Sequence, residues 1–402
     1  SFCWLDFDRL YRGKIFDSEA QLKDRTIKDL NRVFARVEQG AGFIIKKSDC
    51  NDNINDILDR GSSFTDMYFN YIDSKGATKE MPFKKYIQKF ANSINTYTTI
   101  DFAPNTTDSR VFNLWTGYKS SIIDTDDIQP IQPILNHIKE VYCNNDINSY
   151  EYFLDLLYVN FKHPERATGI CTFLYSEKQG SGKNIILDFL EEFIYGKNNV
   201  HNCTGLESIL SSHNAYLKNK KLVVVDELAS SSDSYMSNFD RIKSIMTANT
   251  LTINPKGVNQ YSIKNCLQWF MVSNHSDSIR LEASDRRYFC LKVNEKYVGN
   301  SEYFNALVNT FTQENADIFY SYIIKRGDSK EVNIRVPPVN EFKRSIINQS
   351  ASGGTCFLSY LKEQEFDEPL IKASELYEEF KLWAANNGER IKASRKFYLD
   401  IK

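Results

Sequence analysis

The spacing of apolar residues predicts the elements of the first part of the chain. Apolar residues recur with the helical period of 3.6 over residues 22–39, 86–94 and 128–159. Short apolar runs at 42–47 and 69–83 predict strands, and the second run divides into two extended pieces about a turn. We therefore expect an N-terminal α+β region over residues 1–110, followed by a helical collar over residues 111–165.

From residue 168 the pattern changes to short apolar strands that alternate with helices. The strands are predicted by runs of β-branched and aromatic residues at 168–176, 221–227, 266–274 and 287–293. This alternation is typical of an α/β unit whose mostly parallel sheet is covered by helices on both faces. A helical pattern at 304–326 ends this unit, which we place at 166–330. Residues 331–402 contain linker-like stretches at 336–340 and 349–354 and end in two short predicted helices.

Composition narrows the classes of function. The 402 residues are 42% hydrophobic and 13% aromatic. This composition excludes a disordered protein. No apolar run reaches the length of about 18 residues that predicts a membrane span. The net charge of −2 means that any nucleic acid must be bound by local positive clusters rather than by a general positive field. The eight cysteines form no CxxC pair, which favours buried free thiols in the cytoplasm over a zinc site.

The segment SEKQGSGKN at 176–184 follows a predicted strand and opens a predicted helix, which is the context of a phosphate-binding loop. Backbone N–H groups around its glycines would surround an anion. Lys183 would reach the β- and γ-phosphates, and Asn184 takes the place of the usual Ser or Thr beside Mg²⁺. Glu177 replaces the usual first glycine, and a glycine-rich turn without a ligand is the alternative. The residues expected to bind nucleotide are Gly180, Ser181, Gly182, Lys183 and Asn184.

The segment KLVVVDE at 221–227 predicts a buried central strand that ends in two carboxylates, Asp226 and Glu227. In a phosphate-loop ATPase the first carboxylate orders the ligands of Mg²⁺ and the second polarises the attacking water. The alternative is a strand whose acidic end is solvated or caps the next helix.

Two further features follow in the chain. Asn274 ends the apolar run WFMVSN, where its amide could bind the γ-phosphate or the water, although asparagine is also a common turn residue. Arg286 and Arg287 precede the last predicted strand, and a guanidinium suits the charge that develops on a transferring phosphoryl group, including one bound to a neighbouring subunit. The alternative is a surface ion pair with Asp285 or Glu282.

Residues 250–265 alternate on both sides of an Asn-Pro-Lys-Gly turn, which predicts a β-hairpin with Lys256 at its tip. Lys264 lies in the returning strand. In a ring of subunits the tip lysine would repeat around a central hole, where it could bind a single strand of DNA. A solvated surface lysine is the alternative.

The order of these features between residues 177 and 287 resembles the superfamily 3 helicases, which are AAA+ ATPases. The segments FNLWTGY at 112–118 and LYSEKQGSGKN at 174–184 resemble in particular the helicase part of phage and viral primase-helicases, including the poxvirus type. The resemblance covers about residues 110–330. The tail resembles a winged-helix segment that would continue beyond Lys402, and a packed helical cap is the alternative. Its candidate DNA or partner contacts are Lys392, Arg395 and Lys396.

The resemblance implies an AAA+ phosphate-loop core that binds ATP and Mg²⁺ and works as a hexameric ring. It implies 3′→5′ unwinding on single-stranded DNA at a replication fork, and a primase or polymerase module that precedes Ser1. The implied roles are Walker A for Lys183 and Asn184, Walker B for Asp226 and Glu227, DNA-binding hairpin for Lys256, sensor 1 for Asn274, and arginine finger for Arg286 or Arg287.

We therefore predict an ATP-dependent DNA helicase from a phage, virus or mobile element, acting in the cytoplasm. Two other classes stay open. A phosphate-loop kinase for a small molecule or nucleoside would ignore single-stranded DNA. An oligomeric DNA scaffold would use ATP for assembly only, although the Asp226–Glu227 pair argues against it.

Overall fold

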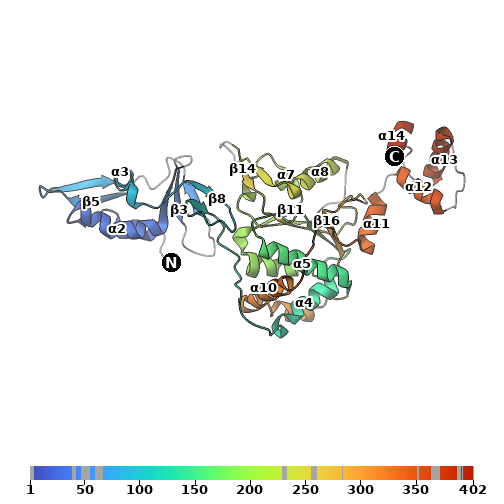
Figure 1. Ribbon diagram of the computed structural model, residues 1–402, viewed down its shortest axis with the longest axis horizontal. Helices are drawn as coiled ribbons and strands as arrows, with labels where there is room; N and C mark the ends of the chain where they lie inside the picture. Colours follow the sequence, from blue (N-terminus) through green and yellow to red (C-terminus); the bar gives the residue numbers. More distant parts are fainter. Residues whose placement is uncertain are drawn as a thin grey trace.

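The chain forms three parts in a row in the computed structural model. Figure 1 shows an N-terminal part, a central part built on a five-stranded sheet, and a C-terminal group of helices. The structure describes residues 4–38, 42–46, 55–58, 67–228, 233–254, 260–282, 284–350, 353–363, 372–386, 391 and 393–401.

The N-terminal part packs helices against a small sheet around an aromatic core. Its main elements are α1 (Trp4–Tyr11), β1 (Ile15–Phe16), α2 (Glu19–Val33), β5 (Tyr68–Ile72), β6 (Thr78–Pro82) and α3 (Phe83–Lys89). The sheet has the order β1-β5-β6, and Phe7, Phe69 and Tyr86 are fully buried in the core. The strand pair predicted over residues 69–83 is confirmed as β5 and β6.

Two helix predictions in this part need correction. The helix predicted over residues 22–39 ends at Val33, and Phe34–Val37 form strand β2, which pairs with β3 (Gly42–Lys46). Phe34 and Ala35 are fully buried, so burial against strand partners outweighs the helical spacing. The helix predicted over 86–94 begins earlier, as α3, and ends before the short helix η3 (Ala91–Ser93).

Short strands complete the N-terminal part and lead into the central part. One sheet has the order β4-β3-β2-β7, and the strands β8 and β9 form a parallel pair. Their bounds are Asn55–Leu58 for β4, Thr96–Tyr97 for β7, Thr99–Asp101 for β8 and Val111–Asn113 for β9.

The central sheet is parallel throughout and has the order β11-β12-β15-β10-β16. This confirms the predicted parallel sheet. The bounds are Cys171–Tyr175 for β10, Val200–Thr204 for β11, Leu222–Asp226 for β12, Gln268–Ser273 for β15 and Tyr288–Lys292 for β16. Every residue of the interior strands β10, β12 and β15 is buried except Asp226, which is half-buried. Burial of successive residues is what a sheet covered on both faces requires.

Helices cover both faces of this sheet (Figure 1). Alternate strand residues enter two separate cores, with Leu174 and Phe270 on one face and Phe173 and Trp269 on the other. The first face carries η4 (Gln129–Ile131), α4 (Gln132–His137), the π-helix η5 (Ile138–Tyr142), α5 (Ile147–Lys162), α6 (Ile185–Phe189), the π-helix η6 (Leu190–Tyr195) and α10 (Gln313–Asp328). The second face carries α7 (Glu207–Leu210), η8 (Ala215–Leu217), α8 (Asp233–Thr247) and α11 (Glu341–Ser350).

The helical pattern predicted over 128–159 is confirmed, and these helices pack on the sheet as part of the first core. The helical pattern predicted over 304–326 is confirmed, and it is divided between α9 (Ser301–Val308) and α10. Thr312 accepts a hydrogen bond from the backbone N–H of Asn315 and so begins α10 as its N-cap. The short helix η7 (Lys197–Asn199) precedes β11.

The C-terminal part consists of α12 (Gly353–Glu363), α13 (Ala373–Asn386) and α14 (Ser394–Asp400). Phe357, Phe380 and Phe397 form its own small core. The linker predicted at 349–354 is partly helical, because its first residues end α11 and its last residues begin α12. No strand occurs among the described residues from 353 to 401, and in the described parts of the chain no helix is long and apolar enough to span a membrane.

Candidate functional site

Parallel strands bring several predicted site residues to one edge of the central sheet. The loop 176–184 follows β10, Asp226 is the last residue of β12, and Asn274 directly follows β15. Because β15 lies between β12 and β10, these three carboxyl ends are neighbours. The carboxyl edge is where open parallel sheets bind their ligands.

Glycines shape the loop between β10 and α6. Gly180 and Gly182 have φ values of +72° and +88°, in a backbone region that residues with a side chain rarely adopt. A Cβ on Gly182 would lie 2.8 Å from Phe304 Cε1 and 2.9 Å from His137 Cε1, whereas nothing lies within 4 Å of a Cβ on Gly180. Gly182 is therefore needed for both conformation and space.

The amine of Lys183 is held inside this loop. Its Nζ donates a hydrogen bond of 2.8 Å to Ser176 Oγ, which lies 2.8 Å from Ser181 Oγ. Burial lowers the pKa of Lys183, and the nearby charge of Asp226 opposes this shift. The loop therefore places a cationic amine beside the acidic end of β12.

Asn184 and Asp226 are in direct contact, although they lie 42 positions apart in the chain. The Asn184 Nδ2 donates a 2.8 Å hydrogen bond to Asp226 Oδ2. The Asn184 Oδ1 is buried and has no hydrogen-bond partner among the described residues. A buried amide oxygen without a partner, next to a carboxylate, fits the all-oxygen ligand set that Mg²⁺ prefers.

The second carboxylate, Glu227, has unusual backbone geometry. Its φ of +54° is in the left-handed region, and its backbone N–H donates a 2.9 Å hydrogen bond to Asp226 Oδ1. The Glu227 side chain is exposed, whereas Asp226 is half-buried. Residues with this backbone conformation cluster at functional sites.

Asn274 contacts the start of the loop 176–184. Its Nδ2 lies 3.0 Å from the carbonyl oxygen of Ser176 and 3.5 Å from that of Glu177. The departure at Glu177 also has a structural explanation, because its carboxylate forms a 3.2 Å ion pair with Lys292 at the end of β16. Both side chains of this pair are exposed, and Gly180 and Gly182 downstream have the positive φ values given above.

A cavity of about 940 Å³ adjoins the loop on the β16 side. Glu177 and Lys292 line it, together with the rings of Tyr142, Tyr175 and Phe342. The rings of Tyr175 and Phe342 are stacked, with centroids 5.0 Å apart. The cavity therefore has aromatic and amide side chains next to the glycine-rich loop.

The sequence did not indicate the residues of the helical layer that contact the backbone of the loop 176–184. His137 Nδ1 lies 2.9 Å from the Tyr303 hydroxyl, and its Nε2 lies 3.4 Å from the Gly182 carbonyl oxygen. The Tyr142 hydroxyl donates to the Lys183 carbonyl oxygen. These residues belong to apolar helical patterns, so only their contacts with the loop identify them. Burial lowers the pKa of His137 to about 4, so the ring is neutral at pH 7.

Arg286 and Arg287 lie at the opposite end of the strands, where the parallel strands of the sheet begin. They precede β16, which runs parallel to β10 with Tyr288 opposite Cys171. The two ends are separated by the length of β16, which has 5 residues. At about 3.3 Å per strand residue, this length is roughly 16 Å. The arginines are therefore remote from the loop 176–184 of the same chain.

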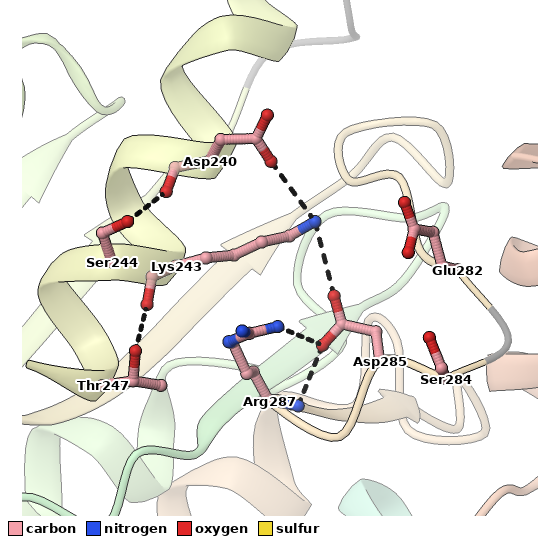
Figure 2. A pocket seen from close by; sticks show the side chains of 8 residues that line it. All are labelled: Asp240, Lys243, Ser244, Thr247, Glu282, Ser284, Asp285 and Arg287. Atoms are coloured by element: carbon pink, nitrogen blue, oxygen red, sulfur yellow. Dashed lines mark hydrogen bonds and ion pairs between the residues drawn. The ribbon is translucent and has the colours of Figure 1, made fainter.

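Arg287 forms the ion pair with Asp285 that the alternative predicted, although Asp285 is buried and the pair is not on the surface. Its Nη1 lies 3.7 Å from Asp285 Oδ1, and its backbone N–H donates to the same oxygen (Figure 2). Arg286 is exposed and makes no hydrogen bond or ion pair with any other residue that the structure describes.

The predicted hairpin is confirmed as β13 (Thr250–Ile253) and β14 (Tyr261–Lys264), which pair antiparallel. Lys256 lies outside the described residues. Lys264 is exposed and pairs with Thr250, at the end of the hairpin farthest from the tip. In the tail, Lys392 is outside the described residues, and Arg395 on α14 is exposed.

Comparison with known proteins shows which proteins this chain is similar to. Residues 174–287 match a protein family of unknown function, DUF5906. The DNA primase-polymerase of Nitratiruptor phage NrS-1 is 28% identical over 234 residues, which cover 56% of this chain and 31% of that protein. The match thus spans about a third of the length of that relative, and the chain is similar to part of a phage DNA primase-polymerase.

Solved structures of the NrS-1 C-terminal region share the fold. One apo structure has a TM-score of 0.57 at 19% identity and covers 83% of this chain and 76% of that chain. A second apo form has a TM-score of 0.58 at 18% identity and covers 84% of this chain and 77% of that chain.

Proposed function

We propose that this chain is the ATP-driven, DNA-translocating part of a phage replication protein, with an AAA+ core of the superfamily 3 helicase type. One observation supports it above the others. Lys183, the Asn184–Asp226 pair and Asn274 converge at the carboxyl edge of one parallel sheet. The similarity to a phage DNA primase-polymerase supports DNA as the track and a primase or polymerase module in the same polypeptide.

Nucleotide binding would use the loop as it stands. The backbone N–H groups between Gly180 and Gly182 would surround the phosphates, as in other loops of this type. The Lys183 amine would exchange its hydrogen bond with Ser176 for the β- and γ-phosphates. Asn184 Oδ1 and Asp226 would hold Mg²⁺, which supplies positive charge to a bound triphosphate.

Hydrolysis would use the exposed carboxylate of Glu227. In this role Glu227 accepts a proton from the attacking water, whose oxygen bonds to the γ-phosphorus as the bond to the β-phosphate oxygen breaks. Asn274, which already contacts the loop, would orient the water or the γ-phosphate. The products are ADP and inorganic phosphate.

The remote position of the arginines supports an inter-subunit site. An arginine roughly 16 Å from its own loop can act on phosphate only in a neighbouring copy, so the proposal includes a ring, for which we propose six subunits. The hairpins, with Lys256 at their tips and Lys264 in the returning strands, would then line the central hole and bind single-stranded DNA. Such a protein would act in the cytoplasm of the host cell.

Phosphate release with and without a single-stranded oligonucleotide tests this proposal. We expect DNA-stimulated hydrolysis in the wild type, loss of nucleotide binding in Lys183→Ala, and retained binding with hydrolysis reduced by about 10²-fold or more in Glu227→Gln. Lys197→Ala is the matched control, because Lys197 is an exposed lysine paired with Glu192 on the surface. Hydrolysis that ignores DNA would favour a kinase, and binding without hydrolysis would favour a scaffold.

A further inference from the structure

Next to the two arginines lies a polar cavity of about 350 Å³ whose charges do not belong to the nucleotide site of the same subunit. It lies between α8 and the segment that leads into β16 (Figure 2). Asp285 is the central group. Its side chain is only 3% exposed, and the cations around it come from two separate elements.

Asp285 makes three polar contacts in this cluster. Its Oδ1 accepts a 2.9 Å hydrogen bond from the backbone N–H of Arg287 and lies 3.7 Å from the Arg287 guanidinium. Its Oδ2 lies 3.4 Å from Lys243 Nζ on α8. Lys343 of α11 is buried behind the same segment and donates to the Tyr288 carbonyl oxygen. A buried carboxylate with these partners fixes the segment, because leaving it unpaired would be costly.

The two adjacent arginines differ in whether Asp285 binds them. Arg287 is half-buried and is held by Asp285 within its own subunit. Arg286 is exposed, and no described residue pairs with it. A guanidinium that is exposed and free of an ion pair can reach a phosphate on another molecule without first giving up a partner.

Asp285 also links the segment before β16 to helix α8, which lies in the chain between Glu227 and the hairpin. Helix α8 begins at Asp233, shortly after Glu227, and ends at Thr247, just before β13 of the hairpin. Through Lys243, a shift of α8 would reach Asp285 and the arginine segment.

We propose that Asp285 is a positioning residue: it anchors Arg287 and α8 so that Arg286 is the arginine presented to the nucleotide of the neighbouring subunit. This inference rests on the proposed function and makes it specific. It assigns different roles to Arg286 and Arg287, which the sequence does not distinguish. It also implies that a shift of α8 changes the position of Arg286 in the same subunit.

Kinetics of ATP hydrolysis by four variants of the whole chain test the inference. We expect Arg286→Ala to lower kcat by about 10³-fold or more while binding of a fluorescent ATP analogue stays within about twofold of wild type. Arg287→Ala and Asp285→Asn should each lower kcat by about tenfold with little change in KM. Ser284→Ala, in the same cavity but outside the ion pairs, should behave as wild type.

Mixed assemblies give a readout that a purely structural role would not change. Arg286→Ala subunits keep an intact loop, and Lys183→Ala subunits keep an intact arginine. Mixing the two inactive proteins should therefore restore hydrolysis at shared interfaces, and mixing either one with Ser284→Ala should show no such gain beyond dilution.

The outcomes separate the two proposals. Wild-type turnover in Lys183→Ala would overturn the proposed function. Loss in Lys183→Ala together with wild-type turnover in Arg286→Ala, or a loss confined to Arg287→Ala, would overturn only the assignment made here. If Asp285→Asn does not fold, Lys243→Gln replaces it, because that change removes one partner and keeps the Asp285–Arg287 pair.

Discussion

The two glycines of the loop allow one prediction to be worked out in detail. Gly180 and Gly182 both have positive φ values, but only Gly182 has close neighbours. Replacement of either by alanine costs about 1 kcal/mol from the left-handed backbone alone. At Gly182 the new Cβ would also lie 2.8 Å from Phe304 and 2.9 Å from His137. Such overpacking typically costs about 1–3 kcal/mol more.

We therefore expect Gly182→Ala to lower the free energy of unfolding by about 2–4 kcal/mol and Gly180→Ala by about 1 kcal/mol. The difference isolates the packing contribution. Phe304 is half-buried and can move, so adding Phe304→Ala to Gly182→Ala should recover part of the loss, while the buried His137 keeps the rest.

Urea unfolding, followed by tryptophan fluorescence, measures these differences, since Trp269 is fully buried in the central sheet and reports on its unfolding. Binding of a fluorescent ATP analogue measures the conformation of the loop in parallel. Equal unfolding midpoints for the two alanine variants, with equal affinities, would refute the reasoning, because the close approach of His137 and Phe304 would then have no effect.

Three further predictions concern the loop 176–184 and the helices that pack on the first face of the central sheet. Burial lowers the pKa of His137 from 6.5 to about 4, so the stability it contributes is complete above its unfolded pKa and is lost as pH falls towards the folded value. We expect the contribution of His137 to make the protein about 2 kcal/mol less stable at pH ~5 than at pH ~7, so that His137→Gln has a pH dependence smaller by about this amount in urea unfolding. Arg326→Ala should cost about 1–3 kcal/mol in the same assay. Its largely buried guanidinium joins α10 to Asp155 on α5 at 2.6 Å, and an unchanged midpoint would contradict this prediction. Glu177→Gly should change nucleotide affinity by less than about fivefold, because an exposed pair such as that with Lys292 contributes at most about 1 kcal/mol. A larger loss would show that Glu177 contacts the ligand.

Much of the central part could be predicted from local patterns. Interior strands such as β12 are continuous apolar runs, because both faces of a parallel sheet are buried, and this signal does not depend on distant residues. The loop with Gly180 and Gly182 could be predicted for a similar reason, since its backbone conformation demands glycine.

Other features depended on residues far apart in the chain. Phe34–Val37 follow a helical spacing but form a strand, because β3 supplies its pairing partner. His137 belongs to an apolar helical pattern and gains its importance only where α4 meets Gly182.

The sequence by itself determined that this chain has a parallel α/β core with a glycine-rich loop and an acidic strand end, because the spacing of apolar residues and the glycines are local properties of the chain. Only the tertiary structure decided that Asn184 contacts Asp226 and that Asp285 binds Arg287 while Arg286 stays exposed. Such pairings follow from the order of the strands and the packing of α8, which bring together groups that no local spacing relates.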